Sequence, residues 1–265
     1  MRATSENNRS PAPGKTEAGN TDRSAGRAGG IAVIIAGLAG IAMFTLELMG
    51  PVLGFDDTDN PVVSLEYLSQ YPQIYALAAV AAFIMAFAYI VASFAVSDVL
   101  APRISSLTRR CLSALGLLAA AFLFMHGVLR DSVGPMLYLD SINSKWGESA
   151  YLTVQMLGTH GFLAAGLIAL GVWSAGICVT GAHSRSLPIW LCVLGLVASL
   201  RLVILMAGPL MTAAAVEVSG IIWVASIALI PFGMLWWLVL GVVLLVKSRR
   251  NQVPPQSRAA TSQEV

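Results

Sequence analysis

Charged residues and chemically reactive side chains are scarce in this sequence. Of its 265 residues only 11% are charged, and cysteine and histidine occur three times each. A soluble domain carries about 25% charged residues, so the composition excludes an ordinary water-soluble enzyme and a disordered protein. The net charge of +2 also excludes the strongly basic surface by which proteins bind nucleic acid.

The short motifs of common catalytic and cofactor sites are absent as well. The sequence contains no nucleophile elbow, Walker loop, dinucleotide-binding glycine pattern or Cys-x-x-Cys pair. Its cysteines, Cys111, Cys178 and Cys192, form no disulfide framework, and we expect them to act as small packing residues. Hydrophobicity is therefore the dominant signal in the chain.

Long apolar runs are what the sequence has in abundance. Apolar residues make up 57% of the chain, and a helix needs about 20 of them to cross the hydrocarbon core of a membrane. The runs are continuous rather than alternating, which favours helices over barrel strands. The sequence therefore predicts an all-α polytopic membrane protein, a bundle of six transmembrane helices at Ile31–Leu53, Ile74–Val96, Leu112–Leu129, Tyr151–Val179, Leu187–Leu210 and Val218–Val246.

Small residues four positions apart predict where these helices pack closely. The first run carries Ala32, Ala36 and Gly40, and the second carries alanine at positions 78, 82 and 86. Asn60-Pro61, in the loop between these two runs, predicts the start of a short additional helix, because Asn is a frequent N-cap and Pro a frequent first helical residue.

The domain organisation and the orientation follow from the polar segments. Residues 1–29 and 248–265 are polar and are predicted to be disordered cytoplasmic tails on either side of a transmembrane domain over residues 30–247. With the N-terminus inside, thirteen of the 16 Lys and Arg residues fall in cytoplasmic segments or tails. This asymmetry follows the positive-inside rule, so we expect both termini to be cytoplasmic.

Four ionisable residues lie inside the predicted membrane helices. From the rise of about 1.5 Å per residue, all four fall in one layer about 8 Å thick in the outer half of the membrane. Ionisable groups within hydrocarbon are costly, and they usually mark a site or pair with each other. The sequence thus predicts a polar chamber that opens to the outside, formed by Glu47, His126, His160 and Arg201 and capped by Arg130 and Asp131.

Three hypotheses account for this layer. In a structural one, Arg201 and Glu47 neutralise each other and the histidines bond to neighbouring helices. In a second, the chamber binds a small anion, a proton or a lipid headgroup, with Arg201 as the fixed positive charge and the histidines as proton carriers. In a third, His126, His160 and Glu47 ligate zinc as in a metal-dependent intramembrane hydrolase, or His126 and His160 hold a haem.

Of these, we favour a non-enzymatic binding or transport-related membrane module without a cofactor, and keep the metal-dependent hydrolase as the alternative. Its binding residues would be Glu47, His126, Arg130, His160 and Arg201. The expected partners are the lipid bilayer and, because six helices make a small transporter, further copies of the chain or another membrane protein; nucleic acid is not expected.

Three segments also carry a resemblance to known proteins. They are Gly54-Phe55-Asp56-Asp57, the hairpin Gly158–Trp190 with Ser186-Leu187-Pro188 at its turn, and Trp236-Trp237 in the last apolar run. Over about residues 30–247 the chain resembles uncharacterised six-helix integral membrane proteins of bacteria, a group without assigned activity. The resemblance implies a six-helix bundle in the bacterial plasma (inner) membrane, and it assigns no catalytic residue.

Overall fold

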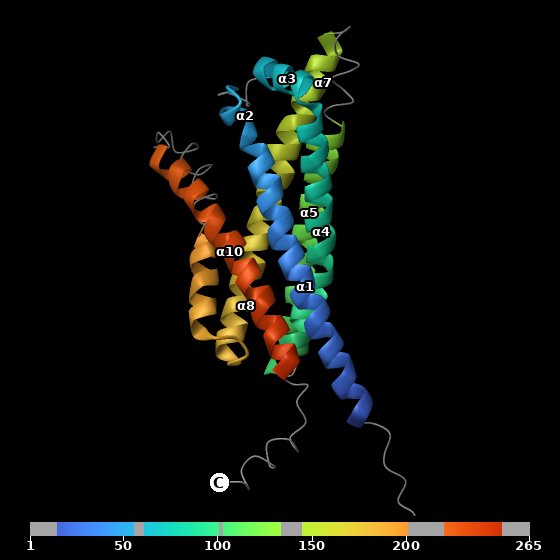
Figure 1. Cartoon of the computed structure of the whole chain (residues 1–265), viewed down its shortest axis with the longest axis vertical. Coiled ribbons are helices and arrows are strands. Elements are labelled where there is room, and N and C mark those ends of the chain that lie inside the picture. The colour runs from blue at the N-terminus through green and yellow to red at the C-terminus, as the bar shows by residue number, and fades with distance from the viewer. Residues whose placement is uncertain (1–14, 56–60, 101–102, 134–144, 201–219, 251–265) are drawn as a thin grey trace, which may run out of the picture.

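Helices that run nearly the full length of the molecule form its body (Figure 1). The computed structural model describes residues 15–55, 61–100, 103–133, 145–200 and 220–250. Within these ranges every regular element is a helix, and no strand occurs. The long α-helices are α1 (Lys15–Glu47), α4 (Pro72–Leu100), α5 (Ser106–His126), α8 (Ala164–His183) and α10 (Gly220–Arg250).

Shorter elements extend or connect the long helices. Two π-helical segments continue them: η2 (Gly127–Val133) follows α5, and η3 (Leu157–Leu163) joins α7 (Lys145–Met156) to α8. The remaining pieces are α2 (Met49–Val52), α3 (Pro61–Gln70) and a helix over Ile189–Leu200. α3 begins at Pro61, which confirms the short helix that the sequence predicts there.

Five helices in the described part of the chain are long and apolar enough to cross a membrane. They span Gly26–Leu46, Pro72–Leu100, Ser106–Leu129, Ser149–His183 and Phe232–Arg249. The predicted count of six is not confirmed. The fifth predicted run is helical over Ile189–Leu200, and its remainder lies in 201–219, outside the described residues.

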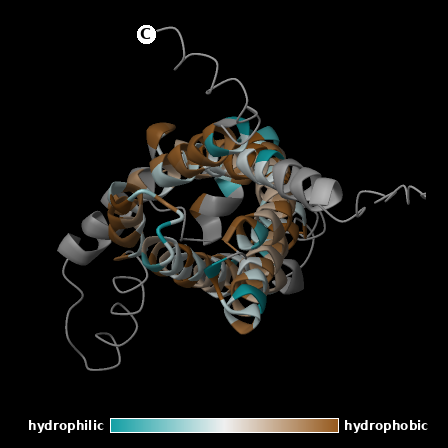
Figure 2. Cartoon of the chain, turned by 90° about the horizontal axis from the view of Figure 1, so that it is seen from below, coloured by the Kyte–Doolittle hydropathy of each residue, from teal (hydrophilic) through white to brown (hydrophobic). Residues whose placement is uncertain are grey.

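The outer surface of the bundle is apolar. On α4, large hydrophobic side chains repeat every three or four residues on the outward face, and Leu77, Val80, Phe87 and Phe94 are each more than half exposed. Figure 2 shows hydrophobic residues over most of the helix surface when the bundle is seen from one end. An apolar stripe of this length would be unfavourable against water, so this is the surface of a membrane-embedded helical bundle.

Small residues let the helices approach closely, as their spacing predicts. α1 packs against α4 and α10, α4 against α5, and α5 against α8. Ala32 and Ala36 on α1 are buried, and so are the alanines at 78, 82 and 86 on α4. A Cβ atom placed on Gly30 would lie 2.9 Å from the Gly241 carbonyl oxygen, so the backbones of α1 and α10 meet where neither has a side chain.

An aromatic cluster occupies the centre of the bundle. Trp173 of α8 stacks on Trp237 of α10 with ring centroids 5.2 Å apart, and Tyr89 of α4 contacts both edge-on at 5.9 and 5.1 Å. Trp236 adds a hydrogen bond from its indole Nε1 to the Leu191 carbonyl at 3.0 Å. Four segments of the chain are thereby joined through buried aromatic side chains.

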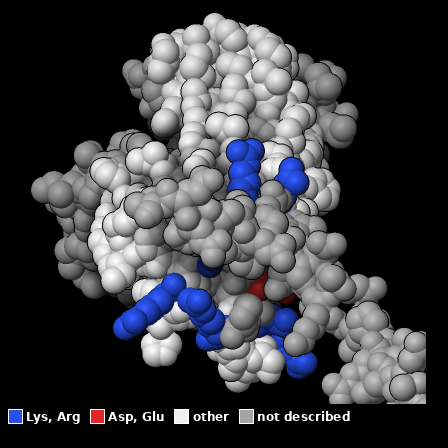
Figure 3. All heavy atoms as spheres, turned by 60° about the horizontal axis from the view of Figure 1, so that its bottom comes forward, with Lys and Arg blue, Asp and Glu red and all other residues white. Residues whose placement is uncertain are grey.

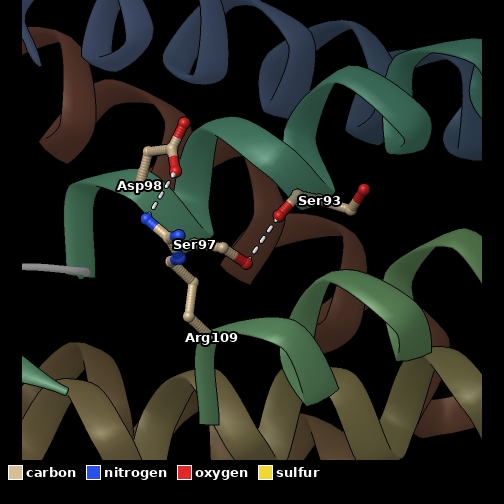
Figure 4. Close-up of polar contacts among 4 residues, drawn as sticks. All are labelled: Ser93, Ser97, Asp98 and Arg109. Carbon is tan, nitrogen blue, oxygen red and sulfur yellow. Dashed lines mark hydrogen bonds and ion pairs between the residues drawn. The ribbon is translucent and has the colours of Figure 1, made fainter. Parts of the chain in front are cut away.

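Polar contacts at one end of the bundle define the connection from α4 to α5. Ser105 is the N-cap of α5, since its hydroxyl accepts a hydrogen bond from the Thr108 backbone N–H at 3.1 Å. Arg109 lies 3.8 Å from the Asp98 carboxylate (Figure 4). Both side chains of this ion pair are about half exposed, so it contributes little to stability.

The bounds of α1 differ from the prediction at both ends. The helix begins at Lys15, so part of the segment expected to be a disordered tail is helical, because a helix already formed gains one hydrogen bond for each residue it adds. It ends at Glu47 rather than Leu53. Pro51 has no N–H to donate to the Glu47 carbonyl, and the chain starts a separate turn, α2.

Replacing Gly116 should disrupt the packing of α4, α5 and α8. A Cβ atom there would lie 2.5 Å from the Ser93 Cβ and 2.9 Å from the Trp173 ring. We expect Gly116→Ala to destabilise the protein by about 1–3 kcal/mol through overpacking, measured by thermal unfolding of the purified protein in detergent. The matched control is Gly233→Ala in α10, where a Cβ meets nothing within 4 Å; equal losses in the two variants would contradict this account.

Candidate functional site

The structure places most of the predicted site residues around the two π-helical segments. His126 is the last residue of α5, Arg130 and Asp131 lie in η2, and His160 lies in η3. Glu47 is the last residue of α1. Arg201 lies outside the described residues, as do the side chains of Glu47, Arg130, Asp131 and His160.

His126 joins the two π-helical segments directly. Its side chain is fully buried, and its Nδ1 lies 2.9 Å from the carbonyl oxygen of Gly158 in η3. A carbonyl only accepts hydrogen bonds, so Nδ1 carries the proton and donates it. In the neutral ring, Nε2 then holds the lone pair, and it is the atom at which the imidazole would gain a proton or ligate a metal.

The two π-helical segments pack against each other. η2 and η3 are in contact, and both also contact α5. A Cβ on Gly127, the first residue of η2, would lie 3.0 Å from the Ala82 Cβ and 3.2 Å from the Phe83 ring, which brings η2 close to α4. π-Helical turns are rare and occur frequently at functional sites, so two of them in contact distinguish this part of the bundle from ordinary helix packing.

Helix contacts also give the height of Glu47 relative to this junction. Gly40 of α1 lies beside Met85 of α4, and Gly127 lies beside Ala82, three residues along α4. With a rise of about 1.5 Å per residue, the backbones of Glu47, His126 and Arg130 fall within about 8 Å of each other along the bundle axis. The meeting of their side chains in one chamber stays a prediction.

The zinc hypothesis needs Glu47 and both histidines to converge on one point. α1, which carries Glu47, packs mainly against α4 and α10 rather than against η2 or η3. Among the side chains that the structure describes, no group of three or more His, Cys, Asp or Glu residues is arranged to hold a metal ion. The proposed ligand set of Glu47, His126 and His160, and a haem between the two histidines, therefore stay hypotheses.

An aromatic cap, which was not predicted from the sequence, covers the same end of the bundle. Tyr67 of α3 contacts Phe55, Tyr71 and Tyr75 with ring centroids 5.0, 5.7 and 5.6 Å apart. Tyr151 of α7 belongs to this cluster. The sequence spacing could have predicted this cluster, because Tyr67, Tyr71 and Tyr75 occur at every fourth residue and would lie on one side of a helix.

A small cavity lies elsewhere, between α8, the helix Ile189–Leu200 and α10. It has a volume of about 50 Å³ and is lined by Leu170, Ser174, Ser199, Trp236 and Trp237 among others. The two serine hydroxyls donate to carbonyls of their own helices, Leu170 and Gly195. This cavity includes none of the residues predicted for the polar layer.

Comparison with protein-family models, with curated proteins and with solved structures finds no match for this chain. The described part of the predicted site is the His126 junction between η2 and η3.

Removing the His126 ring should destabilise the junction. In His126→Ala the Gly158 carbonyl loses a buried donor, and we expect a loss of about 1–3 kcal/mol, measured by thermal unfolding in detergent. His126→Asn is the matched control, because an amide nitrogen can stand where Nδ1 stands and donate the same bond. The asparagine variant should recover most of the lost stability, and equal losses in both variants would show that the hydrogen bond contributes little.

Proposed function

We propose that this protein is a non-enzymatic membrane module, related to binding or transport, that takes up a small anion or a proton at the junction of η2 and η3. The observation that carries the proposal is the hydrogen bond from buried His126 to Gly158, which joins two contacting π-helical segments. These same segments contain the ionisable residues Arg130, Asp131 and His160.

The chemistry of His126 supports a site that responds to protons or anions. A neutral ring with its proton on Nδ1 becomes a cation when Nε2 gains a proton. A buried imidazolium attracts an anion, and its cost in low dielectric falls when the anion binds. Arg130, at a similar height, would add a fixed positive charge to the same layer.

The setting of the module follows from the sequence. We propose that it lies in a bacterial plasma membrane with six spans and both termini in the cytoplasm, which puts the η2–η3 junction in the outer half of the bilayer. Arg201, on the predicted fifth span, would supply a second fixed charge to the layer, and Glu47 would balance part of it. A second copy or another membrane protein would complete a transport pathway.

The proposal can be tested by NMR, because the chain contains only three histidines. Protein labelled with ¹⁵N-histidine in nanodiscs gives signals for His126, His160 and His183, assigned with single asparagine variants. We expect the Nε2 signal of His126 to shift when the pH is lowered or when chloride or inorganic phosphate is added. His183 is exposed at the opposite end of the helix that follows η3, and it serves as the solvent control.

The outcomes separate the hypotheses. If the His126 signal does not shift when the pH is lowered or when chloride or inorganic phosphate is added, while the His183 signal does shift at low pH, His126 is structural only. Stoichiometric zinc in the purified protein, lost in His126→Asn with a matching change in the Nε2 signal, would favour the metal-dependent hydrolase instead.

A further inference from the structure

A second site is suggested at the opposite end of the bundle, at the turn that follows α8. The turn closes with two backbone hydrogen bonds, from the Ser186 N–H to the Gly181 carbonyl at 2.9 Å and from the Arg185 N–H to the Ala182 carbonyl at 3.1 Å. This pair of bonds is the Schellman motif, in which the residue after the C-cap takes a left-handed conformation. That residue here is Arg185, with φ of 51°.

Arginine is an unfavourable residue for this position. Glycine usually occupies it, since a left-handed conformation brings the Cβ atom of any other residue too close to the backbone. Arg185 is the non-glycine residue with positive φ within the described part of the chain. Strained conformations of this kind cluster at functional sites, which makes Arg185 a candidate functional residue.

Two further cations converge on the same turn from other parts of the chain. Arg103, between α4 and α5, donates from Nη1 to the Ser184 carbonyl at 2.8 Å and to the Arg185 carbonyl at 3.2 Å. Lys247 of α10 donates from Nζ to the Ser186 carbonyl at 3.1 Å. Backbone carbonyls of the turn therefore bind the side chains of Arg103 and Lys247, and the turn itself carries a third basic residue, Arg185.

Within the described part of the chain, no salt bridge pairs Arg103, Arg185 or Lys247 with a carboxylate. The salt bridge described at this end joins Asp98 to Arg109. Figure 3, in which this end of the molecule comes forward, shows Lys and Arg side chains gathered there and little surface of Asp or Glu. Three cations around one turn form a site for an anion with several oxygen acceptors.

The neighbouring apolar residues indicate which kind of molecule carries this anionic group. Ile189 and Trp190, directly after the turn, are 74% and 56% exposed. The apolar helix Ile189–Leu200 begins there, and Lys247 lies two residues before the end of the apolar span Phe232–Arg249 of α10. Exposed tryptophan at the end of an apolar helix is typical of the headgroup level of a bilayer, which is also the level of lipid phosphates.

We propose that Arg103, Arg185 and Lys247 bind the phosphate of an anionic phospholipid headgroup at the turn after α8. Arg185 contacts the phosphate directly, and Arg103 and Lys247, anchored on the turn, supply the surrounding positive charge. The site is separate from the His126 junction and does not depend on the function proposed for it.

Arg185→Gly provides a sharp test, because it removes a charge and also relieves the left-handed strain. The full-length protein in detergent would be titrated with phosphatidylglycerol or with phosphatidylcholine, and bound lipid counted by native mass spectrometry. We expect the wild type to prefer phosphatidylglycerol and Arg185→Gly to bind it about fivefold more weakly, the effect of one basic residue near an anionic surface. Its thermal unfolding midpoint should be equal or higher.

Arg110→Gln is the matched control, because Arg110 is an exposed arginine of α5 at the same end, outside the turn. It should bind phosphatidylglycerol as the wild type does. Equal weakening in both variants would show a diffuse effect of net charge, and no weakening in Arg185→Gly would exclude the site; either result overturns the proposal. So would inorganic phosphate that displaces the lipid at equal concentration, since the ligand would then be the free ion.

Discussion

The absence of water within hydrocarbon is the constraint on which this structure depends. Each backbone carbonyl and each polar side chain in the bundle must find its partner within the protein. Helices satisfy the backbone locally, and several contacts between segments use the same kind of bond, a side-chain donor on a backbone carbonyl. Trp236 donates to Leu191, His126 to Gly158, and Lys247 to Ser186. A carbonyl can accept such a bond in addition to its helical one, because it has two lone pairs.

The structure also depends on close packing between the helices. Lipid tails are as apolar as leucine, so helices in a membrane gain little by burying hydrophobic surface, and they associate through fit and polar bonds. Glycine and alanine bring α1 against α4 and α10, and the space left in the centre is filled by Tyr89, Trp173 and Trp237. The fit leaves two polar atoms buried without a hydrogen-bond partner among the described residues, the Tyr89 hydroxyl and the Trp173 Nε1. Such groups cost stability, and the aromatic contacts around them contribute in the opposite direction.

The polar contacts at the two ends of the bundle differ. At one end, His126, the residue directly before η2, contacts the Gly158 carbonyl of η3 within the bundle, on the side of the aromatic cap. At the other end, carbonyls of the turn after α8 accept hydrogen bonds from Arg103 and Lys247, and Arg185 has a conformation that glycine would adopt more easily. The first lies buried within the bundle, whereas the second lies at the end of the bundle, where the Arg185 side chain is exposed.

The sequence by itself determined the helical class, the membrane setting and much of the helix positions, because apolar length and local hydrogen bonding are properties of consecutive residues. The start of α3 was predicted from Asn60-Pro61, whereas the end of α1 at Glu47 was missed, although Pro51 carried a signal for it. Tertiary structure alone decided that His126 meets Gly158, 32 residues further along the chain, and that Arg103 and Lys247 share one turn. These contacts depend on how each helix is rotated and tilted against its neighbours, and a continuously apolar run, with hydrophobic residues on every face, carries little record of that rotation.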